Sequence, residues 1–168
     1  WQLVAQIVQY WDGELPQGGK GEAASKTYLV KQVLKLAGEC AEHLVAPQTV
    51  IEFCTAQIAA YESLSTPGPR KTANDTLRQL QTKIILARMV QRYARVKARM
   101  QVLDYGDLIA LAARIARDVP QAVQLERERY KVVLLDEFQD TSHAQLQLFS
   151  DLFGTRAAEG EHPGYGEH

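Results

Sequence analysis

The chain has 168 residues, of which 46% are hydrophobic and 23% are charged, and this balance is typical of a globular protein with a core. No apolar run approaches the roughly 18 residues that a membrane helix needs, and the N-terminus lacks a basic-then-apolar signal pattern. These features exclude a disordered chain or a membrane protein, and they predict a soluble, cytoplasmic one.

Helical periodicity fills the first part of the chain. Apolar residues at positions 1, 4, 8 and 11 predict a helix over residues 1–11, which ends at Asp12. After a loop rich in Gly and Pro, the same spacing predicts helices over residues 26–45 and 48–64. We therefore expect a helical subdomain at this end of the sequence.

The two cysteines of the chain, Cys40 and Cys54, lie in these predicted helices. Their neighbours are mostly apolar, and two cysteines do not make a disulfide framework. We expect both to be reduced thiols in the core.

A long basic helix is predicted next, over residues 73–100, because no Gly or Pro interrupts it and apolar residues recur at helical spacing. Residues 70–99 hold nine basic side chains and one acid, a net charge of +8, which leaves −9 on the rest of the chain. Four arginines fall within roughly 60° of one another around the helix: Arg88, Arg92, Arg95 and Arg99. Such a stripe can bind nucleic-acid phosphates, or it can be a solvated face or pair with the acidic remainder.

The last part of the chain is predicted to contain the only strand. Helices are expected over residues 103–120 and 121–130, and the run "KVVLL" at residues 131–135 indicates a strand. Because the run is apolar at every position after its lysine, it should be buried on both faces of a sheet whose other strands lie outside this chain. A final helix should begin at a capping box formed by Ser142 and Gln145. The predicted fold is mainly α, with one strand contributed to an α/β core.

Two carboxylates, Asp136 and Glu137, follow the predicted strand directly. In open α/β sheets, ligands bind beyond the carboxyl ends of the strands. There the first carboxylate can hold Mg²⁺, and the second can orient or deprotonate the water that attacks a terminal phosphate. The alternative is an ordinary turn, in which acids complement the dipole of the next helix.

The stretch "VVLLDEFQDT" resembles motif II, the Walker B motif, of the UvrD/Rep-type superfamily 1 DNA helicases, in which four apolar residues precede D-E-[FY]-Q-D-T. About thirty residues upstream, "LDYGDLIALAARI" is similar to the family's "LDFxDLL" segment, with Tyr105 where Phe is usual. The resemblance covers residues 102–154. The preceding helices match the family only in composition, order and length.

The resemblance implies roles for four residues. Asp136 would ligate Mg²⁺, Glu137 would be the catalytic base for ATP hydrolysis, and Gln139 and Asp140 would couple the nucleotide site to neighbouring motifs and the DNA path.

The resemblance also implies a division of the chain. Residues 1–100 would be a helical subdomain of the 1B type, which touches duplex or forked DNA, and residues 101–154 would be part of the RecA-like motor domain 1A, a P-loop NTPase core. Residues 155–168 would be a tail or linker, and the remaining helicase domains would be partners in cis.

The sequence departs from the family by what it does not contain. A phosphate-binding loop needs G-x-x-x-x-G-K-[ST], and the nearest stretch, "GELPQGGKG", has the wrong spacing and Gly21 in place of Ser or Thr. We therefore expect a fragment that does not hydrolyse ATP by itself and holds no tightly bound cofactor, with ATP and Mg²⁺ used by the parent protein.

Three further expectations stay open at this point. The chain could instead be a non-enzymatic helical module that binds DNA or protein, or a purely structural helical domain. The unpaired strand should find a partner by dimerisation or remain poorly ordered, because an exposed apolar strand edge is sticky.

Overall fold

The computed structural model describes residues 1–16, 24–63 and 70–154, and these residues are mainly helical, as predicted. The elements are α1 (Gln2–Gln9), α2 (Lys26–Glu42), α3 (Pro47–Glu62), α4 (Arg70–Met100), α5 (Tyr105–Asp118), α6 (Pro120–Arg129), the 3₁₀ turn η1 (Phe138–Asp140) and α7 (His143–Phe153). They form two compact units, Trp1–Gly106 and Asp107–His168. Over the described ranges, no helix is both long and apolar enough to cross a membrane.

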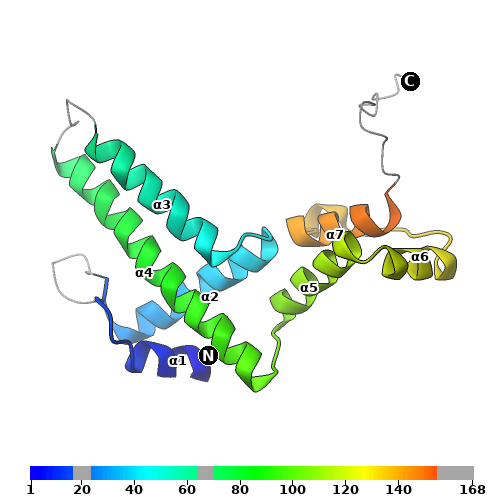
Figure 1. Cartoon of the computed structure of the whole chain (residues 1–168), viewed down its shortest axis with the longest axis horizontal. Coiled ribbons are helices and arrows are strands. Elements are labelled where there is room, and N and C mark those ends of the chain that lie inside the picture. The colour runs from blue at the N-terminus through cyan, green and yellow to red at the C-terminus, as the bar shows by residue number, and fades with distance from the viewer. Residues whose placement is uncertain (17–23, 64–69, 155–168) are drawn as a thin grey trace. The chain divides into compact units, whose positions relative to one another are not determined.

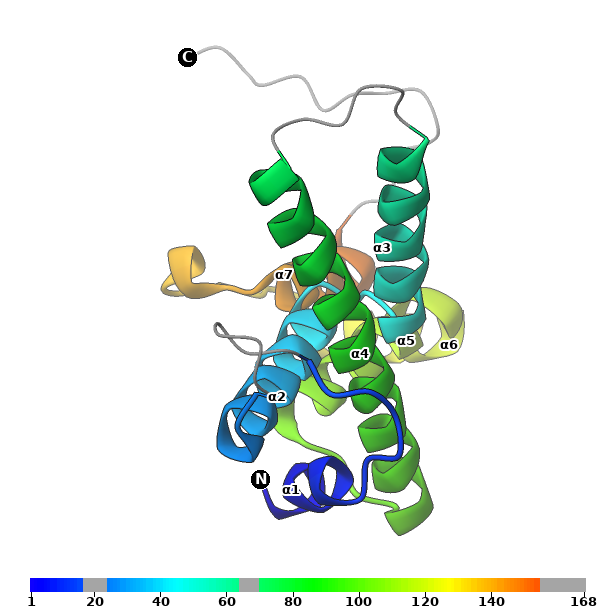
Figure 2. The same ribbon diagram turned by 90° about the vertical axis from the view of Figure 1, so that its left-hand side faces the viewer.

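The core of the first unit is shared by α1, α2 and α4, which pack against one another (Figures 1 and 2). Each helix contributes one apolar stripe, as the sequence periodicity predicts. The buried members are Val4, Ile7 and Val8 of α1, Leu29, Val30 and Val33 of α2, and Leu86, Met89, Val90 and Tyr93 of α4. Two apolar residues at the ends of the predicted helical faces lie outside the core: Trp1 and Met100 are exposed.

Helix α3 lies antiparallel beside α4 (Figures 1 and 2). Its one fully buried residue is Cys54, and Gln91 of α4 donates a hydrogen bond of 2.9 Å to the side chain of Gln48. Most of α3 is therefore exposed on the side that faces away from α4. Pro47 occupies its first turn, where the missing N–H costs no helical hydrogen bond.

Two helices of the first unit end in the same way. Leu44 and Gln101, which follow α2 and α4, both have a φ of 54°. After each helix, two successive backbone N–H groups bond back to the last turn, and this Schellman pattern satisfies carbonyls that would otherwise lack a donor. Glycine is usual in this conformation because it has no Cβ to clash, so neither end could be located from a glycine in the sequence.

The second unit contains most of α5, together with α6, η1 and α7. Helix α7 begins at the predicted capping box: Ser142 Oγ accepts from the Gln145 N–H, and Gln145 Oε1 accepts from the Ser142 N–H at 2.9 Å. At its other end, Arg127 of α6 donates to the carbonyl oxygens of Leu152 and, at 2.8 Å, Gly154. Both ends of α7 are thus satisfied by side chains.

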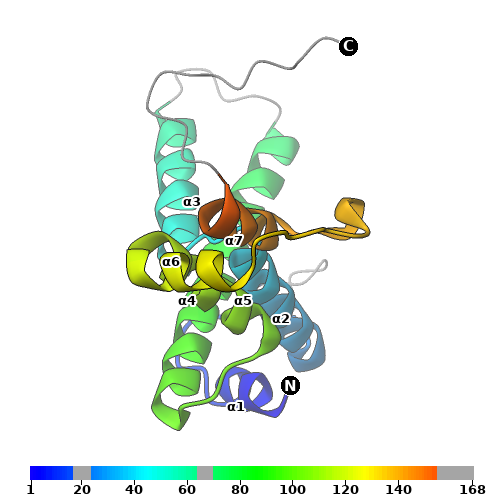
Figure 3. The same cartoon turned by 90° about the vertical axis from the view of Figure 1, so that its right-hand side faces the viewer.

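Residues 131–135 do not form the predicted strand, and the described part of the chain contains no strand at all. Figure 3 shows this segment as part of the extended connection between α6 and α7. Its apolar side chains are exposed, from 38% at Val133 to 90% at Leu134. A strand needs a neighbour to take up its backbone hydrogen bonds, and the residues that the structure describes offer none. Strand formation in a larger sheet, or in a dimer, stays a prediction.

Candidate functional site

The four predicted motor residues lie together in one tight turn of the second unit, which we call the DEFQD turn (residues 136–140). Asp136 Oδ1 accepts the backbone N–H of Glu137 at 2.8 Å, and the Gln139 side-chain amide donates to Glu137 Oε2. The N–H of Asp140 bonds to the carbonyl oxygen of Glu137 at 2.9 Å and closes η1. One of these bonds joins two side chains, Gln139 and Glu137, and the other two involve the backbone of the turn.

Glu137 has the left-handed conformation, with φ 51° and ψ 45°. For a residue with a Cβ this conformation costs roughly 1–2 kcal/mol, and such strain is often found where a side chain must be aimed. Here it directs the chain from the extended segment into η1. The carboxylate of Glu137 consequently comes to lie against the Gln139 amide.

All five side chains of the DEFQD turn are exposed. Magnesium prefers hard oxygen ligands and keeps several waters, so one or two carboxylates together with substrate phosphates are enough to hold it. Asp136 and Glu137 fit that requirement. The described residues do not gather three or more metal-ligating side chains of the His, Cys, Asp and Glu types at any point, so the turn offers neighbouring carboxylates but no complete cage.

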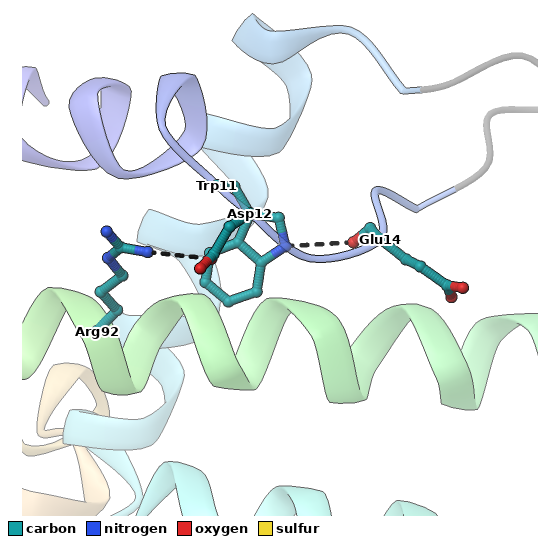
Figure 4. Close-up of polar contacts among 4 residues, drawn as sticks. All are labelled: Trp11, Asp12, Glu14 and Arg92. Atoms are coloured by element: carbon teal, nitrogen blue, oxygen red, sulfur yellow. Dashed lines mark hydrogen bonds and ion pairs between the residues drawn. The ribbon is translucent and has the colours of Figure 1, made fainter.

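The four predicted arginines form one face of α4, which we call the arginine face (Arg88, Arg92, Arg95 and Arg99). Three of them are exposed, and among the described residues they have no ion-pair partner. Arg92 differs, because its Nη1 lies 3.4 Å from Asp12 Oδ1 (Figure 4). Pairing with an acid from elsewhere in the chain, one of the alternatives for this stripe, thus occurs at one arginine of the four.

A polar cluster beside the arginine face was not predicted. Lys97 is only 7% exposed, and its ammonium lies 2.7 Å from Asp104 Oδ2 and 4.4 Å from the centre of the Tyr93 ring. The Tyr93 hydroxyl donates to the same carboxylate at 3.3 Å. Asp104 belongs to the "LDYGDL" stretch, so this segment of the motor resemblance is tied to α4. No sequence signal separated Lys97 from the other basic residues of that helix.

The same stretch approaches α2 at a second point. A Cβ added at Gly106 would lie 3.1 Å from the Cβ of Ala41, closer than most such contacts. Glycine at this position therefore permits the first turn of α5 to pack against the end of α2. The contacts of Gly106 and Asp104 together hold the residues that follow α4 against the first unit.

Both cysteines are free and buried, as predicted. Burial raises the pKa of the Cys40 thiol, with a further contribution from the charge of Glu39, and burial also raises the pKa of Cys54 against a smaller opposing effect of Lys83. A raised pKa lowers the fraction of reactive thiolate at neutral pH. These two residues are thus core side chains rather than nucleophiles.

Comparison with known proteins bears on both the arginine face and the DEFQD turn. ATP-dependent DNA helicase UvrD1 of Mycobacterium bovis is 37% identical over 79 residues, which are 47% of this chain and 10% of that protein. The helicase of the same name from Mycobacterium leprae is 38% identical over 69 residues, 41% of this chain and 9% of that protein. ATP-dependent DNA helicase PcrA of Staphylococcus epidermidis is 31% identical over 86 residues, 51% of this chain and 11% of that protein.

The chain matches about a tenth of the length of these relatives. A family model for the UvrD/REP helicase N-terminal domain matches residues 19–158. That range includes both the arginine face and the DEFQD turn and covers most of the sequence. The chain therefore belongs to the UvrD/REP helicase N-terminal domain family.

Proposed function

We propose that this chain is part of an ATP-dependent DNA helicase. Residues 1–100 would be the helical 1B-like subdomain, which meets duplex or forked DNA, and residues 101–154 would be the motif II part of the RecA-like motor domain. The observation that carries this proposal is the DEFQD turn, in which the carboxylates of Asp136 and Glu137 each accept a hydrogen bond from within the turn, inside the range of the family match. The relatives UvrD1 and PcrA, which are named as ATP-dependent DNA helicases, support it.

Each residue of the turn has a role in this proposal. Asp136 would hold Mg²⁺, whose charge would offset that of the terminal phosphates of ATP, and Glu137 would accept a proton from the attacking water. Gln139, whose amide donates to the Glu137 carboxylate, positions that base. Asp140, which ends η1, couples the nucleotide site to the DNA path.

The apolar residues before the turn support a parent protein with more of the sheet. Val132 and Leu134 are 75% and 90% exposed, and contiguous exposed apolar side chains usually mark a surface that another part of a protein covers. The neighbouring strands of the motor domain are the proposed cover. A dimer formed through this segment is the alternative.

The chain contains no G-x-x-x-x-G-K-[ST] loop, and that loop supplies the backbone N–H groups and the lysine that bind the phosphates. We therefore propose that ATP hydrolysis needs the longer protein, in which the loop would lie upstream of the first helix. This chain by itself binds neither Mg²⁺ nor ATP tightly.

A steady-state ATPase assay tests the proposal. In the longer protein that contains this chain, Glu137→Gln should lower kcat by about 10²- to 10⁴-fold, the range expected for loss of a general base. Glu128→Gln, an exposed residue of α6, is the matched control and should leave the rate unchanged. The chain alone should show no Mg²⁺-dependent turnover.

Two results would contradict this account. Turnover by the isolated chain that Glu137→Gln abolishes would mean that no separate phosphate loop is required. Equal rates for Glu137→Gln and Glu128→Gln in the longer protein would favour the non-enzymatic helical module that binds DNA or protein.

A further inference from the structure

The turn that follows α1 is built around the side chain of Trp11. The indole Nε1–H donates to the carbonyl oxygen of Glu14 at 3.2 Å (Figure 4). A Cβ at Gly13 would lie 2.8 Å from that nitrogen, so glycine is needed where the backbone passes the ring. Trp11 and Leu15 both pack against the core of the first unit, and Pro16 is buried. The turn is thus anchored at both ends.

Asp12 is carried by this anchored turn. Its side chain is 89% exposed, while its Oδ1 lies 3.4 Å from Arg92 Nη1, and the Arg92 side chain is 43% exposed. Figure 4 shows the Glu14 carboxylate pointing away from Arg92 although it belongs to the same turn. The position of the Asp12 carboxylate at the arginine face therefore follows from the shape of the turn.

From this geometry we infer that Asp12 is an intramolecular competitor for nucleic-acid phosphate at Arg92. The inference rests on the proposed DNA-binding role of the arginine face. A phosphate and a carboxylate accept the same guanidinium N–H groups and carry the same sign of charge, so a phosphate that approaches Nη1 of Arg92 competes with Asp12. Because the anchored turn keeps Asp12 beside the helix, its carboxylate competes again for Arg92 whenever the phosphate leaves.

The other three arginines are available without displacement. Asp12 consequently weakens DNA binding without abolishing it. Only the contact of Arg92 with a phosphate, one of the four, depends on competition with Asp12. An exposed ion pair of this kind changes an equilibrium by roughly two- to fivefold. Because each neutralised phosphate contributes to the dependence of affinity on salt, the pair also lowers the salt dependence of binding.

Equilibrium anisotropy with a short fluorescein-labelled DNA duplex, measured over a series of salt concentrations, tests the inference. Asp12→Asn should bind roughly two- to fivefold more tightly than the unchanged chain. Its slope of log affinity against log salt should be steeper by up to about 0.9. Glu14→Gln is the matched control, because it removes one negative charge from the same exposed turn without freeing Arg92, and its affinity should change much less.

Two further variants separate the inference from the proposal on which it rests. Joint Arg95→Glu and Arg99→Glu should strongly weaken binding, and unchanged affinity there would overturn the DNA-binding role of the arginine face itself. If that reversal weakens binding but Asp12→Asn behaves like Glu14→Gln, the DNA-binding role stands and the competition by Asp12 is wrong. In an Arg92→Gln background, Asp12→Asn should give no more than the Glu14→Gln effect, and a full gain there would also overturn the inference.

Discussion

At the scale of single residues, two cations of α4 pair with acids from other segments: Arg92 Nη1 lies 3.4 Å from Asp12 Oδ1, and Lys97 Nζ lies 2.7 Å from Asp104 Oδ2. The carboxylates of the DEFQD turn and the four arginines were identifiable because motif spacing and helical periodicity mark them. The partners of Arg92 and Lys97 were not, since each lies on a separate segment, and an ion pair between separate segments depends on how they pack. Asp12 was identifiable only as a helix stop.

Lys97 leads to a prediction about stability. Asp104→Asn removes the carboxylate charge that offsets a buried ammonium, so the first unit should lose about 1–2 kcal/mol of unfolding free energy. This is less than the roughly 3–5 kcal/mol for a fully buried pair, because the Asp104 side chain is 46% exposed. Urea unfolding followed by circular dichroism measures the loss.

Asp75→Asn is the control for that change, since it removes the same charge from an exposed position of α4 in the same unit. Lys97→Met should cost less than Asp104→Asn, because an apolar side chain of similar length fills the site without a charge. Equal unfolding midpoints for Asp104→Asn and the unchanged chain would show that the cluster does not stabilise the fold.

At the scale of elements, the helices and their N-terminal signals were predictable and several C-terminal ends were not. The prolines of α3 and α6 mark helix starts because their missing N–H costs no bond in the first turn, and the capping box at Ser142 acts through local hydrogen bonds; the sequence shows both kinds of signal directly. The left-handed residues Leu44 and Gln101 lack the glycine that usually marks such an end. Residues 131–135 do not form the predicted strand for a related reason. Strand formation depends on a partner strand and not only on the residues of the segment itself.

The capping box of α7 is directly testable. Ser142→Ala removes the side-chain acceptor for the Gln145 N–H and should destabilise the helix by about 1 kcal/mol. Amides in the first turn of α7 should then exchange with solvent about fivefold faster in hydrogen-exchange measurements. Ser150→Ala, the same chemical change inside α7, should not speed exchange, and equal effects of the two variants would argue against a capping role.

At the scale of the whole molecule, the two units differ in how much apolar surface they bury. The first has a core of large side chains from three helices, whereas the fully buried apolar residues described in the second are Ala113, Ala116 and Ala144. Hydrophobic patterning predicted a helical first unit correctly, because its contacts are internal. It predicted more burial in the second unit than the described residues show, since an apolar run is buried only where another surface covers it, and no described residues cover 131–135.

That difference predicts opposite effects of one substitution in two contexts. Leu134→Asp should change the unfolding free energy of this chain by less than about 0.5 kcal/mol, because the side chain is 90% exposed. It should also reduce any concentration-dependent association seen by sedimentation velocity. In the longer protein, where we propose that Leu134 lies in a sheet, the same change should cost about 2–5 kcal/mol.

Leu125→Asp is the matched control, because Leu125 is 64% exposed on α6 and has no proposed place in the sheet. It should be tolerated in both contexts. If Leu134→Asp is tolerated as well as Leu125→Asp in the longer protein, residues 131–135 do not form a buried strand there.

The contact of Arg127 with the end of α7 has a consequence for loop closure. The segment that carries the DEFQD turn leaves α6 and enters α7, and the guanidinium of Arg127 joins α6 to the far end of α7 through two carbonyl oxygens. The hydrogen bonds of Arg127 therefore offset part of the entropy that is lost when α6 and α7 are brought together around this loop. Insertion of residues 131–135 into a sheet would need only local straightening of the backbone, with α6 and α7 left in place as a frame.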